Sequence, residues 1–301
     1  LRPVLGAHLA DVIVVPVRLD ARDVWCALDA TTTEVTELPS VDLTRRGGEV
    51  AVRDVLVPAD RFLDALDTAT ARDVAAVLIA AEAVGVASWC VTTAAEHAKV
   101  REQFGRPIGQ FQGVKHKCAE MLGRVELARA GTWDAARVTG EADTGPLTAA
   151  AAVSLALDAA FANGKDCIQV LGGIGFTWEH DAHLYLRRAS ALRSLLGPAS
   201  GWRVQAARHA LAGARRQLTV DLGPGAEAIR AEVRSFVDEV GDLPADEQRR
   251  QVADAGFIMP TWPKPWGRDA KAVEQLVIEE EFRRARVPRP GIMIGSWALP
   301  P

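Results

Sequence analysis

The sequence predicts a mainly α-helical protein with a smaller β part, and three observations support this. Alanine is abundant in long blocks, whereas aromatic residues make up only 6% of the chain, a balance that favours helices over a β-sandwich. From about Arg72 onwards, hydrophobic residues recur at three- and four-residue spacings, which is the period of an amphipathic helix. Short β-branched runs gather in residues 1–62, where we therefore expect the strands.

Residues 1–65 are expected to form the β part. The predicted strands are the β-branched or alternating runs Val12–Val17, Val24–Leu28 and Val50–Val57. Pro58 ends the last of these runs, and Gly47 and Gly48 are expected to form a turn between two strands.

Residues 66–219 are expected to form a bundle of five helices. The first helical pattern continues without a breaker to Arg101, far beyond the average helix length of about 12 residues, and such length is typical of bundles. The other predicted helices cover residues 112–139, 147–163 with a continuation to 176, 181–195 and 202–215. Their short connections place neighbouring helices side by side.

A second helical unit is expected after a linker at residues 220–225, where Gly223-Pro224-Gly225 interrupts the pattern. The predicted helices of this unit, residues 226–301, are 229–240, 246–255 and 273–286. A chain of 301 residues is long enough for two domains.

Charge and cysteine content exclude several classes of protein. Lys and Arg number 35 against 39 Asp and Glu, so no overall positive field is expected to attract nucleic acid or anionic lipid. The four cysteines, Cys26, Cys90, Cys118 and Cys167, lie far apart. They predict neither a zinc site nor a disulfide framework, and a reducing cytosol fits them best.

No membrane segment is expected, because the longest apolar run, Leu147–Leu157, is shorter than the roughly 18 residues that a span requires. No secretory leader opens the sequence. The chain begins in mid-pattern at Leu1, which suggests a piece of a longer protein. We therefore expect a cytoplasmic protein.

One group of residues has metal-ligand chemistry: Glu179, His180, Asp181 and His183. The two histidines, three residues apart, could share one helix face. A solvated helix start is the favoured alternative, because acidic residues suit the first turn of a helix and no distant third ligand is marked. No metal site is predicted.

Two segments carry the densest functional signal, Arg101–Gln112 and Gln169–Phe176. An arginine can pair with a phosphate as a rigid fork, glutamines can bond phosphate, ribose or ring edges, and paired glycines allow a ligand close to the backbone. Neither segment is a phosphate loop or a dinucleotide-binding turn after a strand. The alternative is structural: a helix end broken by Gly105 and Pro107, and a glycine turn between helices.

These segments resemble the flavin-dependent acyl-CoA dehydrogenases. The pattern Arg101-x-x-Phe-Gly, followed by Phe111-Gln112 and later by Gln169-x-x-Gly-Gly-x-Gly-Phe, is similar to the C-terminal helical domain of that family. Residues 1–62, ending in Asp-Val-Leu-Val-Pro-Ala, resemble the back half of its middle β-domain. Residues 256–267, with Pro-Thr-Trp-Pro-Lys, resemble the early part of its N-terminal helical domain.

The order of these parts is unusual, because a unit like the family's N-terminal domain follows one like its C-terminal domain. The chain therefore resembles the junction of a tandem-fused actinobacterial acyl-CoA dehydrogenase of the steroid side-chain type. A circular permutation is the alternative. The front of the β-domain is not in these residues.

The resemblance implies FAD as cofactor and an acyl-CoA thioester as substrate. It further implies that the flavin is held mainly by a neighbouring copy or half, which this chain would contact through Arg101, Gln103, Phe104, Gln112, Gln169, Gly172 and Gly173. The implied partners are another dehydrogenase half or subunit, in a homo-oligomer, and an acceptor like electron-transfer flavoprotein. Pro198-Ala199-Ser200 departs from the family, which usually has Thr and Gln contacts to the flavin there.

The family's chemistry needs a carboxylate that takes the α-proton while the β-hydride passes to the flavin. The resemblance places this base at Leu196 or at Ala75, and neither residue can accept a proton. Asp73 and Glu82 lie near Ala75 in sequence, and both are expected to point to other faces of the helix.

Three functions remain open from the sequence. The first is a non-catalytic part of an acyl-CoA dehydrogenase that completes a partner's flavin site. The second is a flavin-free structural or assembly module that keeps the fold, because fold alone does not guarantee function. The third is a relative of flavin monooxygenases or nitroalkane oxidases, which only substrate reactivity would distinguish.

Overall fold

The computed structural model describes residues 1–20, 22–216, 222–292 and 295. The chain divides into two units, with the boundary after Arg216. Residues 220 and 221 of the expected linker, and the last residues of the expected second helical unit, lie outside the described part.

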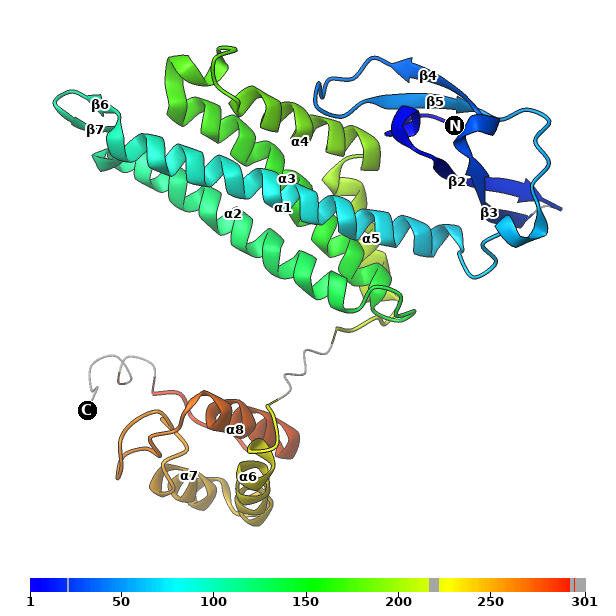
Figure 1. The fold of residues 1–301 in the computed structure, drawn as a ribbon. Helices are drawn as coiled ribbons and strands as arrows, with labels where there is room; N and C mark the ends of the chain where they lie inside the picture. Colours follow the sequence, from blue (N-terminus) through cyan, green and yellow to red (C-terminus); the bar gives the residue numbers. More distant parts are fainter. Residues whose placement is uncertain (21, 217–221, 293–294, 296–301) are drawn as a thin grey trace. The chain divides into compact units, whose positions relative to one another are not determined.

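Five helices form most of the first unit (Figure 1). They are α1 (Thr68–Val100), α2 (Gln112–Arg137), α3 (Gly145–Leu171), α4 (Ala182–Leu196) and α5 (Ala199–Leu211). α3 packs against the other four, and small residues such as Ala152, Ala156 and Ala160 are fully buried along it. The predicted bundle is confirmed, with helix ends shifted by about a turn or less.

Polar side chains define the starts and contacts of these helices. Asp67 caps α1 by accepting a hydrogen bond from the Thr70 amide at 2.8 Å, which satisfies one of the free amides of the first turn. Asn163 is fully buried in α3. Its amide donates to the carbonyls of Ala87 in α1 and Met121 in α2 at 3.3 and 3.0 Å, so one buried group fixes three helices without an unpaired donor.

Short strands precede the bundle and lie at one end of it (Figure 1). β1 (Val4–Leu5), β5 (Gly47–Ala51) and β4 (Glu34–Leu38) form a three-stranded antiparallel sheet in that order. β2 (Val12–Leu19) and β3 (Arg22–Asp29) form a separate antiparallel ribbon. Alternate residues of the ribbon, such as Val15 and its partner Cys26, are buried. The strands predicted at 12–17 and 24–28 are confirmed.

The turn predicted at Gly47 and Gly48 is wrong, because both residues lie inside β5. A β-carbon on Gly48 would lie 2.9 Å from Val35 Cγ1 and 3.3 Å from Ala7 Cβ. Glycine is therefore required here by close packing rather than by a turn. The strand also ends at Ala51, well before the predicted end at Val57, and β4 was not expected.

Ion pairs join the β part to the bundle. Arg188 of α4 pairs with Asp42 and with Glu82 of α1, and both nitrogens of the Arg45 fork lie 2.8 Å from the Glu82 carboxylate. Burial acts to raise the pKa of Asp42, but hydrogen bonds from Thr44 and Arg188 outweigh it and lower that pKa below its ordinary value. The two arginines thus balance the two carboxylates of this cluster.

The described part of the second unit contains three helices, α6 (Ala226–Val240), α7 (Ala245–Asp254) and α8 (Ala272–Ala285). The helices predicted at 229–240, 246–255 and 273–286 are thus confirmed. Phe236, Phe257 and Phe282 pack together in its core, with ring centroids 4.6 to 6.3 Å apart. Glu281 of α8 is also buried there.

Replacing Glu281 by Gln is expected to destabilise the second unit by about 1–3 kcal/mol at pH 7. The carboxylate accepts hydrogen bonds from Arg234, Arg284 and Arg230, which lower its pKa to about 2. Because the folded pKa lies below the unfolded value, this stabilisation is present above about pH 4.5 and is lost as the pH falls towards 2.

Urea-dependent hydrogen exchange of the α6 and α8 amides would measure this effect, with exposed Glu239→Gln as the control. The difference between the wild type and Glu281→Gln should shrink between pH 4.5 and 2. A stability difference between the wild type and Glu281→Gln that is the same at pH 7 and near pH 2 would contradict a stabilising role of the Glu281 carboxylate.

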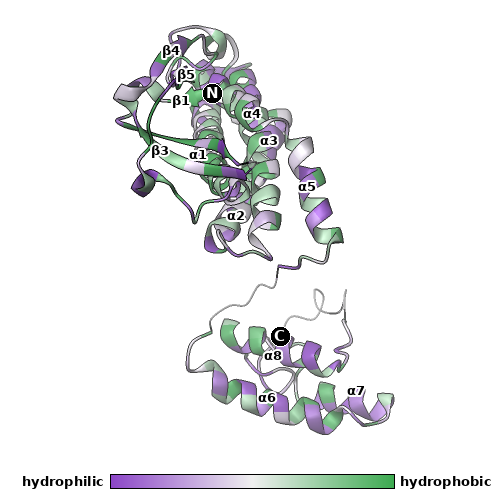
Figure 2. Cartoon of the chain, turned by 90° about the vertical axis from the view of Figure 1, so that its right-hand side faces the viewer, coloured by the Kyte–Doolittle hydropathy of each residue, from purple (hydrophilic) through white to green (hydrophobic). Residues whose placement is uncertain are grey.

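Two helices are long and apolar enough to cross a membrane by length and composition, α1 and the stretch Gly145–Phe176 that begins with α3. The expectation that no segment reaches this length is therefore wrong by that measure. Of their most apolar windows, 39% and 61% are buried inside the protein. Hydrophobic segments, green in Figure 2, alternate with paler and hydrophilic ones in the bundle. Both helices pack against each other in the bundle core.

Candidate functional site

The first of the two glycine-containing segments forms a hairpin at the end of the bundle opposite the sheets (Figure 1). Its strands are β6 (Glu102–Gln103) and β7 (Arg106–Pro107). Phe104 and Gly105 connect them with φ angles of 54° and 77°, the positive values that a two-residue hairpin turn requires. The Phe104 side chain is consequently 93% exposed.

Backbone contacts fix this hairpin to α1. The amide of Ile108 donates to the carbonyl of Arg101 at 2.7 Å, which closes the hairpin at its base. A β-carbon on Gly109 would lie 2.8 Å from the carbonyl oxygen of Ala98, so only glycine allows the chain to pass this closely over α1. Gly105 and Pro107 therefore lie in an ordered hairpin, not in a simple break between two helices.

The second segment follows the end of α3 at the same end of the bundle. Gly172 has φ 66° and ψ −135° and starts the 3-10 helix η5 (Gly172–Phe176). The positions of a β-carbon on Gly172 or Gly173 are open, so a ligand can approach this backbone closely. Gly175, by contrast, is buried.

The two segments meet around a hollow of about 530 Å³. Gln103, Phe104 and Gln169 of the predicted contact residues line it, together with apolar side chains such as Ile108 and Val170. Lys117 of α2 also lines it, although the motif ends at Gln112. Its charge is compensated by Asp166 at 2.8 Å, so it is part of the wall rather than a free cation.

The other predicted contact residues lie close in sequence but do not line this hollow. Gln112 begins α2 and is exposed. Arg101 caps the C-terminal end of α1, and its exposed guanidinium forms no ion pair or side-chain hydrogen bond among the residues that the structure describes. Exposed guanidinium and amide groups, open glycine backbone and an apolar hollow together suit a ligand with both phosphates and rings.

Both predicted base positions hold apolar side chains in different helices. Ala75 is exposed on α1. Leu196 ends α4 and packs against the bundle core, while its carbonyl accepts a hydrogen bond from Trp202 Nε1 at 2.9 Å. The guanidinium of Arg72 lies 4.4 Å from the Trp202 ring centroid. No carboxylate is present at either position.

The two nearby carboxylates differ in their relation to Ala75. Helical rotation turns Asp73 to the opposite face, but Glu82, seven residues after Ala75, returns to within about 20° of the same face, so the expectation that rotation points it elsewhere is wrong. Glu82 is engaged by Arg45 and Arg188 at the β part, so it cannot serve as a free base. Asp73 lines a separate hollow of about 390 Å³ with Asp67 and residues of the α2–α3 connection. Burial raises the pKa of Asp73.

The candidate metal ligands near α4 take other roles. The Ala182 amide donates to Nδ1 of His180 at 3.0 Å, and the His183 ring packs edge-on against Trp178 with centroids 4.6 Å apart. Among the described residues, no group of three or more His, Cys, Asp or Glu side chains could hold a metal ion.

Comparison with known proteins matches this architecture. A family model described as "Acyl-CoA dehydrogenase, C-terminal domain" matches residues 68–211, which are α1 to α5. The acyl-CoA dehydrogenase FadE34 of Mycobacterium tuberculosis is 45% identical over 301 residues, covering 99% of this chain and 41% of that protein. The chain belongs to the acyl-CoA dehydrogenase family.

Other members of the acyl-CoA dehydrogenase family agree with this. The acyl-CoA dehydrogenase IpdE2 of Mycolicibacterium smegmatis is 36% identical over 202 residues, covering 64% of this chain and 61% of that protein. The crystal structure of the ChsE4-ChsE5 complex from Mycobacterium tuberculosis superposes with a TM-score of 0.62 at 27% identity, covering 70% of this chain and 58% of that one. This dehydrogenase-family chain thus spans less than two thirds of these relatives' length.

Proposed function

We propose that this chain is part of an FAD-dependent acyl-CoA dehydrogenase, in which it completes a flavin site that another half or subunit mainly provides. The observation that carries the proposal is a contrast within one unit. Ligand-binding groups converge at the hairpin end of the bundle, whereas both base positions, Ala75 and Leu196, are apolar.

The chain's own residues have distinct roles in this proposal. Arg101 binds a phosphate of FAD, because its guanidinium is exposed and unpaired among the described residues. Gln103, Gln112 and Gln169 hydrogen-bond the nucleotide part, and the open backbone at Gly172 and Gly173 allows close approach. Phe104 covers an apolar surface of the ligand. FAD, when bound, supplies the hydride acceptor of the reaction.

The proton of the acyl-CoA α-carbon is removed by a carboxylate outside this chain. An apolar side chain cannot act as a general base, and Glu82 is held by two arginines. Two findings support a second half or subunit: FadE34 continues well beyond the aligned region, and ChsE4-ChsE5 was solved as a complex. The tandem-fusion resemblance favours a bulky steroid side-chain thioester, with an acceptor like electron-transfer flavoprotein.

We place the protein in the cytoplasm. All four cysteines are free thiols, which suits a reducing compartment. Cys90 and Cys167 are both buried in the bundle core without forming a disulfide.

Replacing Arg101 by Ala in the intact protein is expected to weaken flavin retention about tenfold to a hundredfold, the effect of losing one charge-assisted hydrogen bond to phosphate. The flavin-to-chain ratio after gel filtration, from the visible absorbance, would measure it. Arg53→Ala, which removes an exposed arginine of the β part, should retain flavin as the wild type does. Equal flavin content in all three proteins would disprove the role of Arg101.

The alternative is a flavin-free structural module, which the two apolar base positions also favour. The visible spectrum of the intact protein distinguishes the two functions. Bound flavin that bleaches on anaerobic addition of a bulky acyl-CoA supports the dehydrogenase, and a protein purified without flavin supports the module. Bound flavin that a nitroalkane bleaches instead would indicate an oxidase relative on the same fold.

A further inference from the structure

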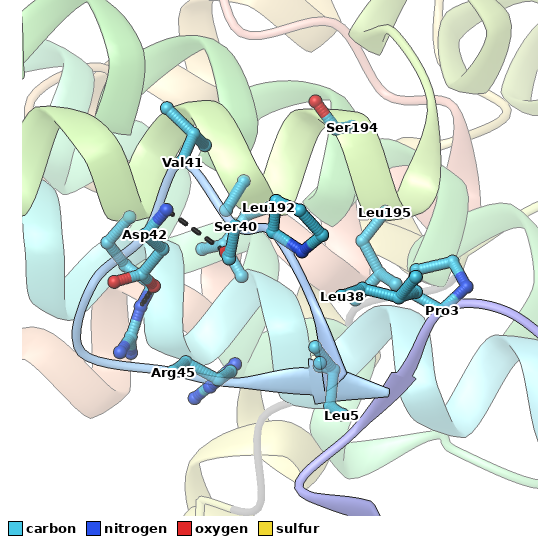
Figure 3. A pocket seen from close by; sticks show the side chains of 14 residues that line it. Pro3, Leu5, Leu38, Ser40, Val41, Asp42, Arg45, Leu192, Ser194 and Leu195 are labelled. Carbon is cyan, nitrogen blue, oxygen red and sulfur yellow. Dashed lines mark hydrogen bonds and ion pairs between the residues drawn. The ribbon is translucent and has the colours of Figure 1, made fainter. Parts of the chain in front are cut away.

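A third hollow lies between the three-stranded sheet and α4, at the opposite end of the bundle from the hairpin (Figures 1 and 3). Its volume is about 400 Å³, within the range of about 300–1,000 Å³ that is usual for small-molecule sites. Leu5 and Leu38 line it from the sheet, and Leu192 and Leu195 line it from α4. Its surface is therefore mainly aliphatic.

The charged groups of this hollow are neutralised among themselves. Arg45 and Arg188 line it together with Asp42. Both arginines pair with Glu82, and Arg188 also pairs with Asp42. Among the described residues that line the hollow, no cation is left over to bind the phosphates of a coenzyme or the carboxylate of a fatty acid, and burying such a charge without a partner is unfavourable.

One free hydroxyl lies at the rim among the described lining residues. Ser40 Oγ accepts a hydrogen bond from the Asp42 amide at 3.1 Å, drawn as a dashed line in Figure 3. Among the described residues, no acceptor takes the proton of this hydroxyl. Ser194, the other hydroxyl at the hollow, already donates to the Ser190 carbonyl at 3.1 Å. Among the described residues, the site thus offers an aliphatic cavity with one free hydroxyl donor, that of Ser40.

The rim itself is also apolar and accessible. Leu5 is 42% exposed and Val41 is 50% exposed, although both line the cavity. A ligand that covers them would remove hydrophobic surface from water, which is favourable in proportion to the area buried.

We propose that this hollow binds a compact, uncharged, hydrophobic molecule that carries one hydrogen-bond acceptor, such as a ring ketone. Its carbonyl would accept the proton of Ser40, while its ring fills the space between Leu38 and Leu195. This site is separate from the hairpin end and involves neither Ala75 nor Leu196, so the inference does not depend on flavin binding.

Three probes of the same shape test the proposal by equilibrium dialysis against the intact protein: 2-acetylnaphthalene, 2-ethylnaphthalene and 2-naphthoate. We expect one molecule of the ketone to bind per chain, and the charged naphthoate to bind at least about tenfold more weakly. Ser40→Ala should weaken binding of the ketone about fivefold, the effect of one neutral hydrogen bond, and leave 2-ethylnaphthalene unchanged.

A cavity-filling variant locates the site. Ala191 of α4 lines the hollow, so Ala191→Trp should abolish binding of both neutral probes. Ala119→Trp, on the exposed face of α2, should bind them normally. If circular dichroism shows that Ala191→Trp does not fold, the binding of the ketone and of 2-ethylnaphthalene to Ser40→Ala still tests the proposal.

Three results would overturn the proposal. Tighter binding of naphthoate than of the ketone would show an uncompensated cation, and unchanged affinity in a folded Ala191→Trp would place the probes elsewhere. Absence of binding by the intact protein would mean that another part of the polypeptide or a protein partner fills the hollow.

Discussion

Replacing Arg188 by Ala is expected to lower the free energy of unfolding of the first unit by about 3–5 kcal/mol, the usual cost of removing one partner of a buried ion pair. Arg188 pairs with Asp42 and Glu82 and donates to Thr44 Oγ1 at 2.6 Å. The Asp42 side chain is only 1% exposed, so without Arg188 its charge would be left buried beside Thr44 alone.

The neighbouring Arg187 offers a matched control, because its hydrogen bond to the Val41 carbonyl is exposed and it forms no ion pair among the described residues. We expect Arg187→Ala to change stability by less than about 1 kcal/mol. Urea unfolding followed by far-UV circular dichroism would measure both variants. A similar loss of unfolding free energy in the two variants would show that the Arg188 ion pairs do not stabilise the contact between the β part and the bundle.

The second large effect is expected at Gly175. A β-carbon there would lie 2.7 Å from the Ile168 carbonyl oxygen and 2.8 Å from Leu171 Cβ, so Gly175→Ala must displace the end of α3. We expect a loss of about 3 kcal/mol, typical of overpacking against atoms that cannot move freely, together with disruption of the glycine turn.

Gly173 lies two residues away, and a substitution there tests ligand contact without a change in stability. A β-carbon on Gly173 meets no atom within 4 Å, so Gly173→Ala should leave the unfolding transition unchanged. Under the proposed function it should still lower the flavin-to-chain ratio, because a methyl group would stand where the ligand approaches the backbone. Thermal unfolding and visible absorbance on the same samples would test both statements, and equal stability of the two variants would refute the packing argument.

The carboxylates of α1 illustrate how far local rules reach. The rotation of a helix about its axis points Asp73 away from the face of Ala75, but it returns Glu82, seven residues on, to within about 20° of that face. Ion pairs at the β part, rather than rotation, prevent Glu82 from acting as a base. Its partners could not be predicted, because Arg45 and Arg188 are 37 and 106 residues away in sequence. Only packing of α1, α4 and the β part brings them together.

The glycines illustrate the same division. Gly105 was expected to break the chain, and it does, with a positive φ in the hairpin turn. Gly48 was also expected in a turn, yet it lies in β5. It is glycine there because Val35 and Ala7 leave no room for a side chain. A glycine's neighbours in space are invisible to a sequence pattern, so its reason for being glycine is visible only when the requirement is local.

The sequence by itself determined the helices, the two principal strands, the break before the second unit and the family of this protein, because helical period, turn residues and motif spacing are properties of short stretches of chain. Only the tertiary structure decided that the hairpin and the glycine turn share one hollow, that Asp42, Arg45, Glu82 and Arg188 neutralise one another, and that an aliphatic cavity separates the sheet from α4. These features depend on contacts between residues far apart in sequence, and the energy of such contacts follows from burial and distance, which are defined only in the folded chain.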